Sequence, residues 1–251
     1  IFQCLPEDRA VINRMGFNNG GQAEAIERLR LMPRTGRVIG INIGANKDAA
    51  DRIADYVTGV RQMAPYADYL TVNISSPNTP GLRALQGRGP LDELLSAVMA
   101  ERGEHGPPVF LKVAPDLEPA DIEDIAASVI EHKVDALIVS NTTISRPPLY
   151  SPDADETGGL SGAPLHDLAL QRLKDFRAVL GASVPLIGVG GIANAEQAYA
   201  RIRAGASLIQ IYSAMVYEGP YLAARINKGL KALLERDGFT NISQAVGIDA
   251  A

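Results

Sequence analysis

The chain has 251 residues, of which 46% are hydrophobic and 21% are charged, and its formal net charge is −5 at pH 7. This size suffices for a substantial core in one domain, while the negative balance argues against nucleic acid as a bulk partner. A single cysteine, Cys4, excludes a disulfide framework and a cysteine-rich metal site, and no apolar run approaches the roughly 20 residues that a membrane-spanning helix needs.

Short apolar runs alternate with helical patterns along the chain, which is typical of βα units and a parallel sheet. Several runs are apolar almost without alternation, as in strands that are covered on both faces. The six expected strands are 38–43, 69–74, 109–113, 136–140, 186–189 and 208–212. The expected helices are 47–63, 91–101, 119–132, 164–180, 194–204 and 220–236, and the longest irregular stretch is 146–157.

Six βα units are two short of a closed (β/α)8 barrel. Before Gln22, only the apolar run 10–13 could add a strand, and it is too short to supply both. The chain also starts at Ile1 rather than at a methionine. We therefore expect an α/β fold of the TIM-barrel type whose first two strands precede Ile1, with residues 1–251 as a single domain. An open sheet is the alternative.

The strand at 69–74 runs directly into amides, hydroxyls and prolines, in the segment Asn73-Ile74-Ser75-Ser76-Pro77-Asn78-Thr79-Pro80. Each proline fixes its own φ and restricts the residue before it, so these polar groups have little backbone freedom. Rigidly held polar groups at the carboxyl end of a parallel strand are where α/β barrels place their chemistry. An enzyme is therefore the leading interpretation.

Ser76 is a candidate base or nucleophile in this segment. A serine hydroxyl is intrinsically a poor base, no histidine is near it in the sequence, and there is no Gly-x-Ser-x-Gly elbow, so a hydrolase triad is disfavoured. The three histidines, His105, His132 and His166, are scattered and lack the spacing of zinc ligands. We expect solvated or supporting roles for them and no metal site.

Four asparagines recur at expected element ends or turns: Asn13, Asn73, Asn78 and Asn141. Each carboxamide offers two donors and an acceptor, which suits a ligand with alternating carbonyl and N–H edges, such as a pyrimidine ring. Asparagine also favours turns for conformational reasons. The residues alone leave both interpretations open.

A lysine and two strand ends suggest an anionic ligand. Lys112 interrupts an apolar strand; its amine either points into the barrel mouth, where it could stabilise negative charge on a cofactor, or extends to solvent. Two later strands end in Gly190-Gly191 and in Tyr212-Ser213. Loops of the last two strands of an α/β barrel frequently hold a phosphate, although tight turns alone would also explain them. The glycine-rich stretch 158–162 could let backbone approach a flat ligand.

Eight motifs, taken in order over essentially the whole chain, resemble the quinone-linked class of the dihydroorotate dehydrogenase family. They are Asn13-Arg14-Met15-Gly16-Phe17-Asn18, Gly40-Ile41-Asn42-Ile43-Gly44, Asn73-Ile74-Ser75-Ser76-Pro77-Asn78-Thr79, Lys112-Val113-Ala114-Pro115-Asp116, Ser140-Asn141-Thr142-Thr143, Thr157-Gly158-Gly159-Leu160-Ser161-Gly162, Gly188-Val189-Gly190-Gly191-Ile192 and Gln210-Ile211-Tyr212-Ser213. Serine at position 76, where the soluble classes carry a cysteine, points to the quinone-linked class. The resemblance implies an FMN enzyme that oxidises (S)-dihydroorotate to orotate in the fourth step of pyrimidine synthesis and passes the electrons to a membrane quinone.

The same resemblance implies roles for individual residues. Ser76 matches the catalytic base, which takes the C5 proton while hydride passes from C6 to flavin N5, and Phe17 and Thr79 would shape its proton exit. The implied substrate-binding residues are Asn13, Arg14, Met15, Gly16, Phe17, Asn73, Asn78, Asn141 and Thr142. The implied flavin contacts are Asn42, Asn73, Lys112, Ser140, Gly162, Gly191, Tyr212 and Ser213, the last three near the phosphate.

Two parts of the family pattern have no counterpart in this chain: the first two barrel strands, and the amino-terminal helical extension that forms the quinone tunnel and lies on the membrane. We expect an incomplete barrel here, and a peripheral location on the cytoplasmic face of the inner membrane if the source is bacterial. The alternatives are a soluble fumarate- or NAD-linked relative, a non-redox phosphate-binding barrel, or a fragment that binds ligand without turnover.

Overall fold

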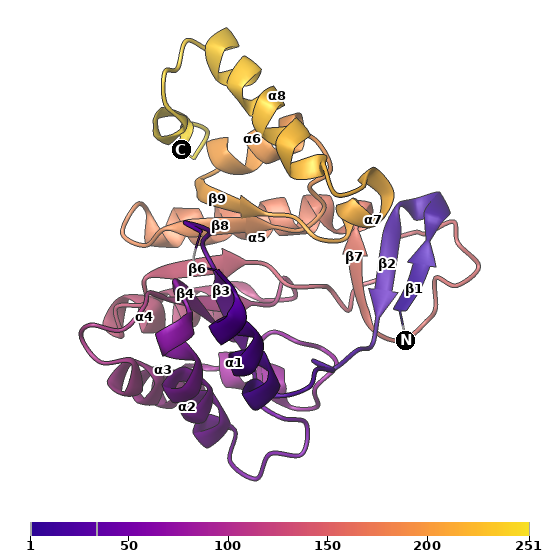
Figure 1. The fold of residues 1–251 in the computed structure, drawn as a ribbon. Coiled ribbons are helices and arrows are strands. Elements are labelled where there is room, and N and C mark those ends of the chain that lie inside the picture. Colours follow the sequence, from indigo (N-terminus) through magenta and orange to yellow (C-terminus); the bar gives the residue numbers. More distant parts are fainter. Residues whose placement is uncertain (1, 34, 251) are drawn as a thin grey trace.

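The computed structural model describes residues 2–33 and 35–250, and two sheets organise them (Figure 1). The larger sheet has six strands in the order β3-β4-β5-β6-β8-β9, and every neighbouring pair is parallel. Its strands are β3 (Gly40–Ile43), β4 (Tyr69–Asn73), β5 (Val109–Val113), β6 (Ala136–Val139), β8 (Leu186–Val189) and β9 (Ala206–Gln210). The spatial order follows the chain order, as successive right-handed βα units require.

Helices connect these strands and pack beside one another in chain order, α2 on α3, α3 on α4 and α4 on α5 (Figure 1). The helices are α1 (Gln22–Leu31), α2 (Arg52–Met63), α3 (Arg88–Arg102), α4 (Pro119–Glu131), α5 (His166–Leu180), α6 (Ala195–Arg203), α7 (Ala214–Glu218) and α8 (Leu222–Arg236). Short 3-10 turns are η1 (Pro6–Asp8), η2 (Ala64–Tyr66), η3 (Leu82–Gln86), η4 (Ala163–Leu165) and η5 (Ile242–Ala245). Among the described helices, none has both the length and the apolar character needed to cross a membrane.

Local capping explains where several helices begin. The Asp51 side chain accepts a hydrogen bond from the Ala54 amide at the start of α2, and the Asn194 side chain accepts one from the Gln197 amide at the start of α6. At α4, Glu118 and Asp121 form a reciprocal capping box ahead of a helix whose first residue is proline. These contacts satisfy amides that have no partner inside the helix.

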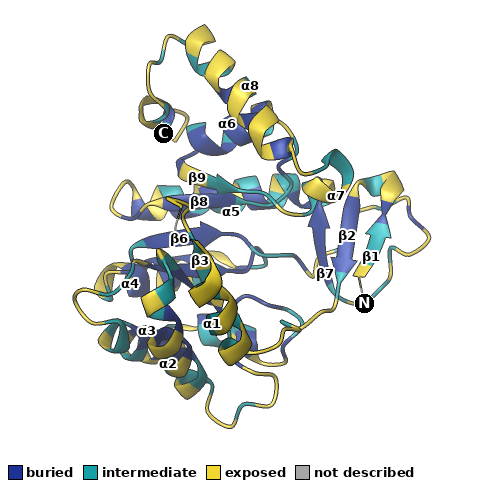
Figure 2. Ribbon diagram, viewed as in Figure 1, coloured by how far each residue is buried: buried dark blue, intermediate teal, exposed yellow. Residues whose placement is uncertain are grey.

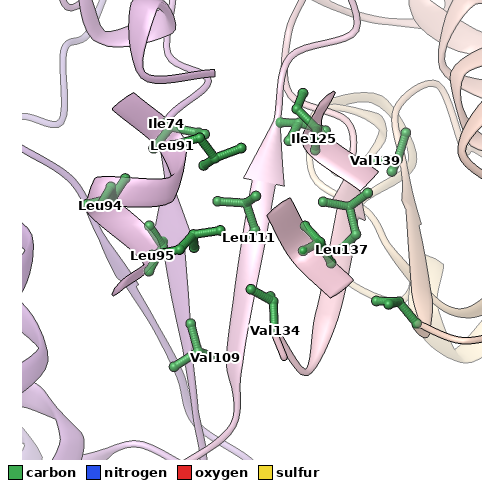
Figure 3. Packing of buried hydrophobic residues seen from close by; sticks show 14 of the residues in the cluster. Ile74, Leu91, Leu94, Leu95, Val109, Leu111, Ile125, Val134, Leu137 and Val139 are labelled. Atoms are coloured by element: carbon green, nitrogen blue, oxygen red, sulfur yellow. The ribbon is translucent and has the colours of Figure 1, made fainter. Parts of the chain in front are cut away.

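The core lies between the parallel sheet and the helices. Leu111 of β5 and Leu137 of β6 point toward α3 and α4, where they meet Leu95 and Ile125 (Figure 3). The alternate residues of β6 are also buried, in a separate cluster on the opposite face, and Figure 2 shows the central strands buried throughout. Both faces of the sheet are therefore covered at its central strands, which confirms the expectation from the unbroken apolar runs, while the edge strands β3 and β9 are partly exposed.

A second, antiparallel sheet joins the amino-terminal strands to a segment in the second half of the chain (Figure 1). Its strands are β1 (Phe2–Leu5), β2 (Ala10–Asn13) and β7 (Gly159–Gly162), in the order β1-β2-β7. The approach of β7 to β2 requires glycine, because a Cβ on Gly162 would lie 2.4 Å from the Arg9 carbonyl oxygen. This sheet was not predicted, since glycine-rich β7 lacks a strand pattern and pairs with a segment far away in the sequence.

Element boundaries differ from the predictions mainly at strand and helix ends. Strands β5 and β8 have the predicted bounds, β4 and β6 end one residue early, and β3 and α2 begin late. The prediction of a strand at 208–212 is wrong by two residues, because β9 spans 206–210. Val189, the last residue of β8, pairs with Gln210, and the ladder stops there because Gly190 turns away at φ +114°. Helices α1 and α7 were not predicted.

Candidate active site

A cavity of about 930 Å³, including its open mouth, is lined by residues of both sheets. Its wall combines the carboxyl ends of the parallel strands with the β1–β2–β7 sheet. The predicted site residues on the wall are Asn13, Met15, Lys112, Ser140, Asn141, Thr142, Gly162, Gly191, Tyr212 and Ser213.

Lys112 reaches this wall because of strand alternation. In β5, Val109, Leu111 and Val113 face the helices, so Lys112 faces the opposite side of the sheet, next to Asn73 of β4. Burial lowers the pKa of its amine, and no hydrogen bond or ion pair within the described residues engages it. Of the two interpretations open from the sequence, the structure supports the inward-facing lysine.

The glycine loop after β8 is held by a buried arginine. Arg201 of α6 is fully buried and donates from Nη2 to the carbonyl oxygens of Gly190 at 2.6 Å and His166 at 2.8 Å. Its Nε and Nη1 are buried and find no partner in the described part of the chain, and burial lowers the pKa of Arg201 to about 10. Arg201 therefore remains a cation at neutral pH and places positive charge behind the loop.

Gly191 fits this loop for steric reasons. Its φ is +66°, and a Cβ there would lie 2.5 Å from the His166 Cα. The His166 Nδ1 lies 3.0 Å from the Gly191 carbonyl oxygen, so this histidine has a supporting contact, as expected. On the neighbouring loop after β9, the Ser213 hydroxyl donates to the Ser161 hydroxyl of β7 at 2.7 Å. Both loops are thus fixed against structure on either side of the cavity.

Two of the four predicted asparagines, with Asn42, form one hydrogen-bonded chain across the strand ends. The Asn141 side chain donates to the Ser75 hydroxyl at 2.9 Å, and that hydroxyl donates to Asn73 Oδ1 at 2.8 Å. The Asn73 Nδ2 in turn donates to Asn42 Oδ1 at 3.1 Å. Ser75 thus bridges Asn141 and Asn73, a role that was not predicted because no local pattern distinguishes Ser75 from Ser76 beside it.

The other two asparagines join the loop after β4 to β2. The Asn78 side chain donates to the Asn13 carbonyl oxygen at 3.0 Å and to Asn13 Oδ1 at 3.3 Å. Gly16 lies in the same contact, since a Cβ on it would be 3.9 Å from the Asn78 carbonyl oxygen. The structure therefore brings the four asparagines together in two groups, connected through the segment from Asn73 to Asn78.

Ser76 lies in that connecting segment and is buried, with 7% exposure. Its hydroxyl accepts a hydrogen bond from the Asn78 amide at 3.2 Å. Within the described residues, no histidine or carboxylate contacts the hydroxyl, in agreement with the argument against a hydrolase triad. Thr79 is buried as well, and the Phe17 ring packs over Gly44, where a Cβ would lie 3.2 Å from it.

Some predicted residues are not on the cavity wall. Asn42, Asn73, Ser76 and Asn78 connect to it through the hydrogen bonds above, and Gly16 and Phe17 form a turn with φ values of +63° and +60°. Arg14 extends toward the long loop after β6, where it contacts Glu156 at 3.0 Å and the Thr157 carbonyl oxygen at 2.9 Å.

Comparison with known proteins identifies the family. A family model described as dihydroorotate dehydrogenase matches residues 2–234. Dihydroorotate dehydrogenase (quinone) from Erythrobacter litoralis is 65% identical over 97% of this chain and 71% of its own length. The chain belongs to the dihydroorotate dehydrogenase family. The dihydroorotate dehydrogenase (quinone) of Sphingopyxis alaskensis is also 65% identical, over 98% of this chain and 70% of its own length.

A solved structure agrees with this assignment. The crystal structure of DHODH from Eimeria tenella in complex with ferulenol superimposes with a TM-score of 0.93 at 38% identity, covering 99% of this chain and 74% of that one. The fold of dihydroorotate dehydrogenases is the TIM barrel, and the six sequential parallel strands described here are part of it. Both the family and the fold expected from the motifs are confirmed. Dihydroorotate dehydrogenases are flavin-dependent enzymes; the roles of individual residues stay predictions.

Proposed function

We propose that this chain carries the active site of a quinone-linked dihydroorotate dehydrogenase, which oxidises (S)-dihydroorotate to orotate in the fourth step of pyrimidine synthesis. The observation that carries the proposal is 65% identity, over 97% of the chain, to a relative of that name. Residues 1–251 would form one barrel domain. The proposed location is peripheral, on the cytoplasmic face of the inner membrane if the source is bacterial, with contact through the amino-terminal extension that the family resemblance implies.

FMN is the proposed cofactor, and the residues present fit it. The half-buried amine of Lys112 has no counter-ion among the described residues, which suits an anionic edge of a flavin ring. The glycine loop at Gly190 and Gly191, with the Arg201 cation behind it, suits a phosphate. When bound, FMN supplies the hydride acceptor for the reaction.

The chain's own groups would act on the substrate. The carboxamides of Asn13, Asn73, Asn78 and Asn141 would hold and orient the carbonyl and N–H edges of the ring. Ser76 Oγ would take the proton from C5 as hydride leaves C6, which converts the C5–C6 single bond into the double bond of orotate, while the hydroxyl's own proton would leave by the exit that Phe17 and Thr79 shape. The Asn78 backbone amide already donates to Ser76 Oγ, so it would stabilise the negative charge that develops on this oxygen as the hydroxyl proton departs.

The proposal is tested on the purified natural protein loaded with FMN. Anaerobic dihydroorotate should bleach the visible flavin absorption, and a short-chain quinone should restore it, whereas fumarate and NAD should not. Flavin that stays oxidised with dihydroorotate would contradict the proposed substrate. Restoration by fumarate or NAD instead of quinone would favour the soluble relatives.

Replacing Arg201 by methionine should selectively weaken phosphate binding. The variant keeps an apolar stem of similar length but loses the hydrogen bond to the Gly190 carbonyl oxygen in the glycine loop, the hydrogen bond to the His166 carbonyl oxygen, and the charge behind the loop. We expect FMN affinity to fall at least tenfold, while affinity for riboflavin, which has no phosphate, changes less than threefold; each tenfold change corresponds to about 1.4 kcal/mol. Fluorescence quenching titrations measure both.

Arg203→Met is the matched control for this variant. Arg203 lies two residues away on the same helix but ion-pairs with Asp237 and Asp249, away from the loop. The Arg203→Met variant should leave the affinities for FMN and for riboflavin unchanged. Equal losses of FMN and riboflavin affinity in Arg201→Met would exclude a phosphate-specific role.

A further inference from the structure

One arginine connects three of the loops that follow the parallel strands. Arg83 lies in η3, after β4, and its side chain donates from Nε to the Ser75 carbonyl oxygen at 3.0 Å and from Nη2 to the Thr142 carbonyl oxygen at 2.9 Å. Its Nη1 donates to Asp116 Oδ2 at 2.9 Å, in the loop after β5. Each of the three guanidinium nitrogens thus donates to a different loop.

Asp116 adds a second set of contacts to the loop after β6, which Arg83 already binds at Thr142. Its carboxylate accepts hydrogen bonds from the hydroxyls of Thr143 and Ser145 and from the Ile144 amide, in addition to Arg83. Burial alone would raise its pKa, but these hydrogen bonds outweigh burial and the pKa of Asp116 is lowered, so the carboxylate is ionised at neutral pH. We call the pair Arg83–Asp116 the loop strap.

The loop strap is sheltered from solvent. The Arg83 and Asp116 side chains are 20% and 13% exposed, which sets this pair apart from the exposed ion pairs elsewhere on the surface. Removing one partner of a shielded pair leaves the other without compensation, so its loss has larger effects than loss of a surface pair. The guanidinium also supplies planar, fixed donor geometry that a lysine cannot reproduce.

The carbonyl groups that Arg83 binds are next to the proposed catalytic groups. Ser75 precedes Ser76, and Thr142 follows Asn141, so Arg83 sets the distance between the segment with the hydroxyl and the segment with a substrate carboxamide. We propose that Arg83, supported by Asp116, is a positioning residue that keeps Ser76 and Asn141 in register for the reaction. This inference rests on the proposed function for its catalytic part, while the ordering of the two loops stands independently of it.

Arg88 offers a matched control. It lies at the start of α3 and, like Arg83, binds two types of partner: the carboxylates of Asp92 and Glu131, and the Asp124 carbonyl oxygen. Its contacts connect α3 to α4 and reach none of the site loops. Arg88→Met therefore reproduces the loss of a helical arginine and its ion pairs without touching the strap.

The experiment compares Arg83→Met, Arg83→Lys and Arg88→Met with the unaltered protein. Amide hydrogen exchange, measured with and without FMN, should accelerate at 74–79 and 140–146 in Arg83→Met but not in Arg88→Met. Anaerobic flavin reduction by dihydroorotate should slow about 10- to 100-fold in Arg83→Met, because a displacement of about 1 Å can cost about 10²-fold. Bound FMN should stay within twofold, and Arg83→Lys should lie between Arg83→Met and the unaltered protein in both measurements.

Each result bears on the inference. Unchanged hydrogen exchange at both loops in Arg83→Met would show that Arg83 does not order them. Accelerated exchange with an unchanged rate of flavin reduction would show that Arg83 orders the loops but does not position the catalytic groups. If Arg88→Met lost as much exchange protection and as much of the rate of flavin reduction as Arg83→Met, the effect would be general destabilisation and not loss of the strap. If the unaltered protein does not oxidise dihydroorotate, the proposed function fails, and with it the catalytic part of the inference, while the exchange comparison still decides the ordering of the loops.

Discussion

Replacing Ser76 by alanine slows the reduction of bound flavin by dihydroorotate about 10²- to 10⁴-fold, the range expected for loss of a general base. Orotate binding stays near normal, because the Asn73–Asn42 and Asn78–Asn13 contacts do not involve the Ser76 side chain. Stopped-flow absorbance under anaerobic conditions measures the rate, and titration of the flavin spectrum with orotate measures the binding.

Ser151→Ala is the matched control for this experiment. Ser151 is equally buried, at 6% exposure, and its hydroxyl likewise accepts a hydrogen bond from the backbone amide two residues further on. The two substitutions therefore remove the same local turn contact, but only Ser76 adjoins the carboxamides. Flavin reduction at an unaltered rate in Ser76→Ala would remove this serine from the mechanism, and slowing in both variants would indicate a conformational effect.

Replacing Lys112 by methionine should raise the stability of the flavin-free protein and lower its affinity for FMN. The flavin-free variant should be more stable than the unaltered protein at neutral pH, because it no longer has to accommodate a desolvated amine that has no counter-ion in the described part of the chain. We expect a gain of about 1 kcal/mol, or about 2–4 °C in melting temperature for a domain of this size. FMN affinity should fall at least tenfold, since the cation that would face the ring is gone.

The pH dependence of stability supports the same assignment. The pKa of Lys112 in the folded chain is lowered from its ordinary value of 10.5, so the folded state binds fewer protons than the unfolded state between the lowered pKa and 10.5. The free energy of unfolding of the flavin-free protein therefore rises with pH across this window. Below the lowered pKa, the buried charge reduces the free energy of unfolding by its full amount. Above pH 10.5 the amine is neutral in both states and this reduction is gone. In Lys112→Met this contribution disappears.

Lys228→Met controls for the loss of a positive charge. Lys228 is exposed on α8 and is not among the residues that line the cavity. It should change neither FMN affinity nor the pH dependence of stability. A Lys112→Met protein that is purified with a full complement of FMN would contradict the proposed contact with the cofactor.

Much of the site could be predicted from the sequence because strand ends leave a local signal. Lys112 interrupts an apolar strand, and Asn73 to Thr79 combine polar side chains with prolines, so both segments stood out without any contact information. Strand alternation then explains why Lys112 and Asn73 face the same side of the sheet, as paired neighbours in the register.

The supporting residues had no such signal. Tyr56 donates to the Asn73 carbonyl oxygen at 2.7 Å and is fully buried, but in the sequence it is one more apolar position of α2. Ser75, Arg83 and Arg201 likewise resemble an ordinary loop serine and helical arginines. Their importance comes from the backbone carbonyls and side chains that they meet, which lie on other loops.

By itself, the sequence determined the alternation of six strands with helices, the parallel sheet with two covered faces, and the family to which its motifs belong. Those features depend on residue periodicity and on short segments in which chemistry and backbone restriction coincide. Only the tertiary structure decided that β2 pairs with β1 on one side and with β7 on the other, that Lys112 has no counter-ion among the described residues, and that Arg83 holds two site loops together. These depend on contacts between segments far apart in the chain, and no local pattern of residues encodes which distant partner a carbonyl or a strand edge will meet.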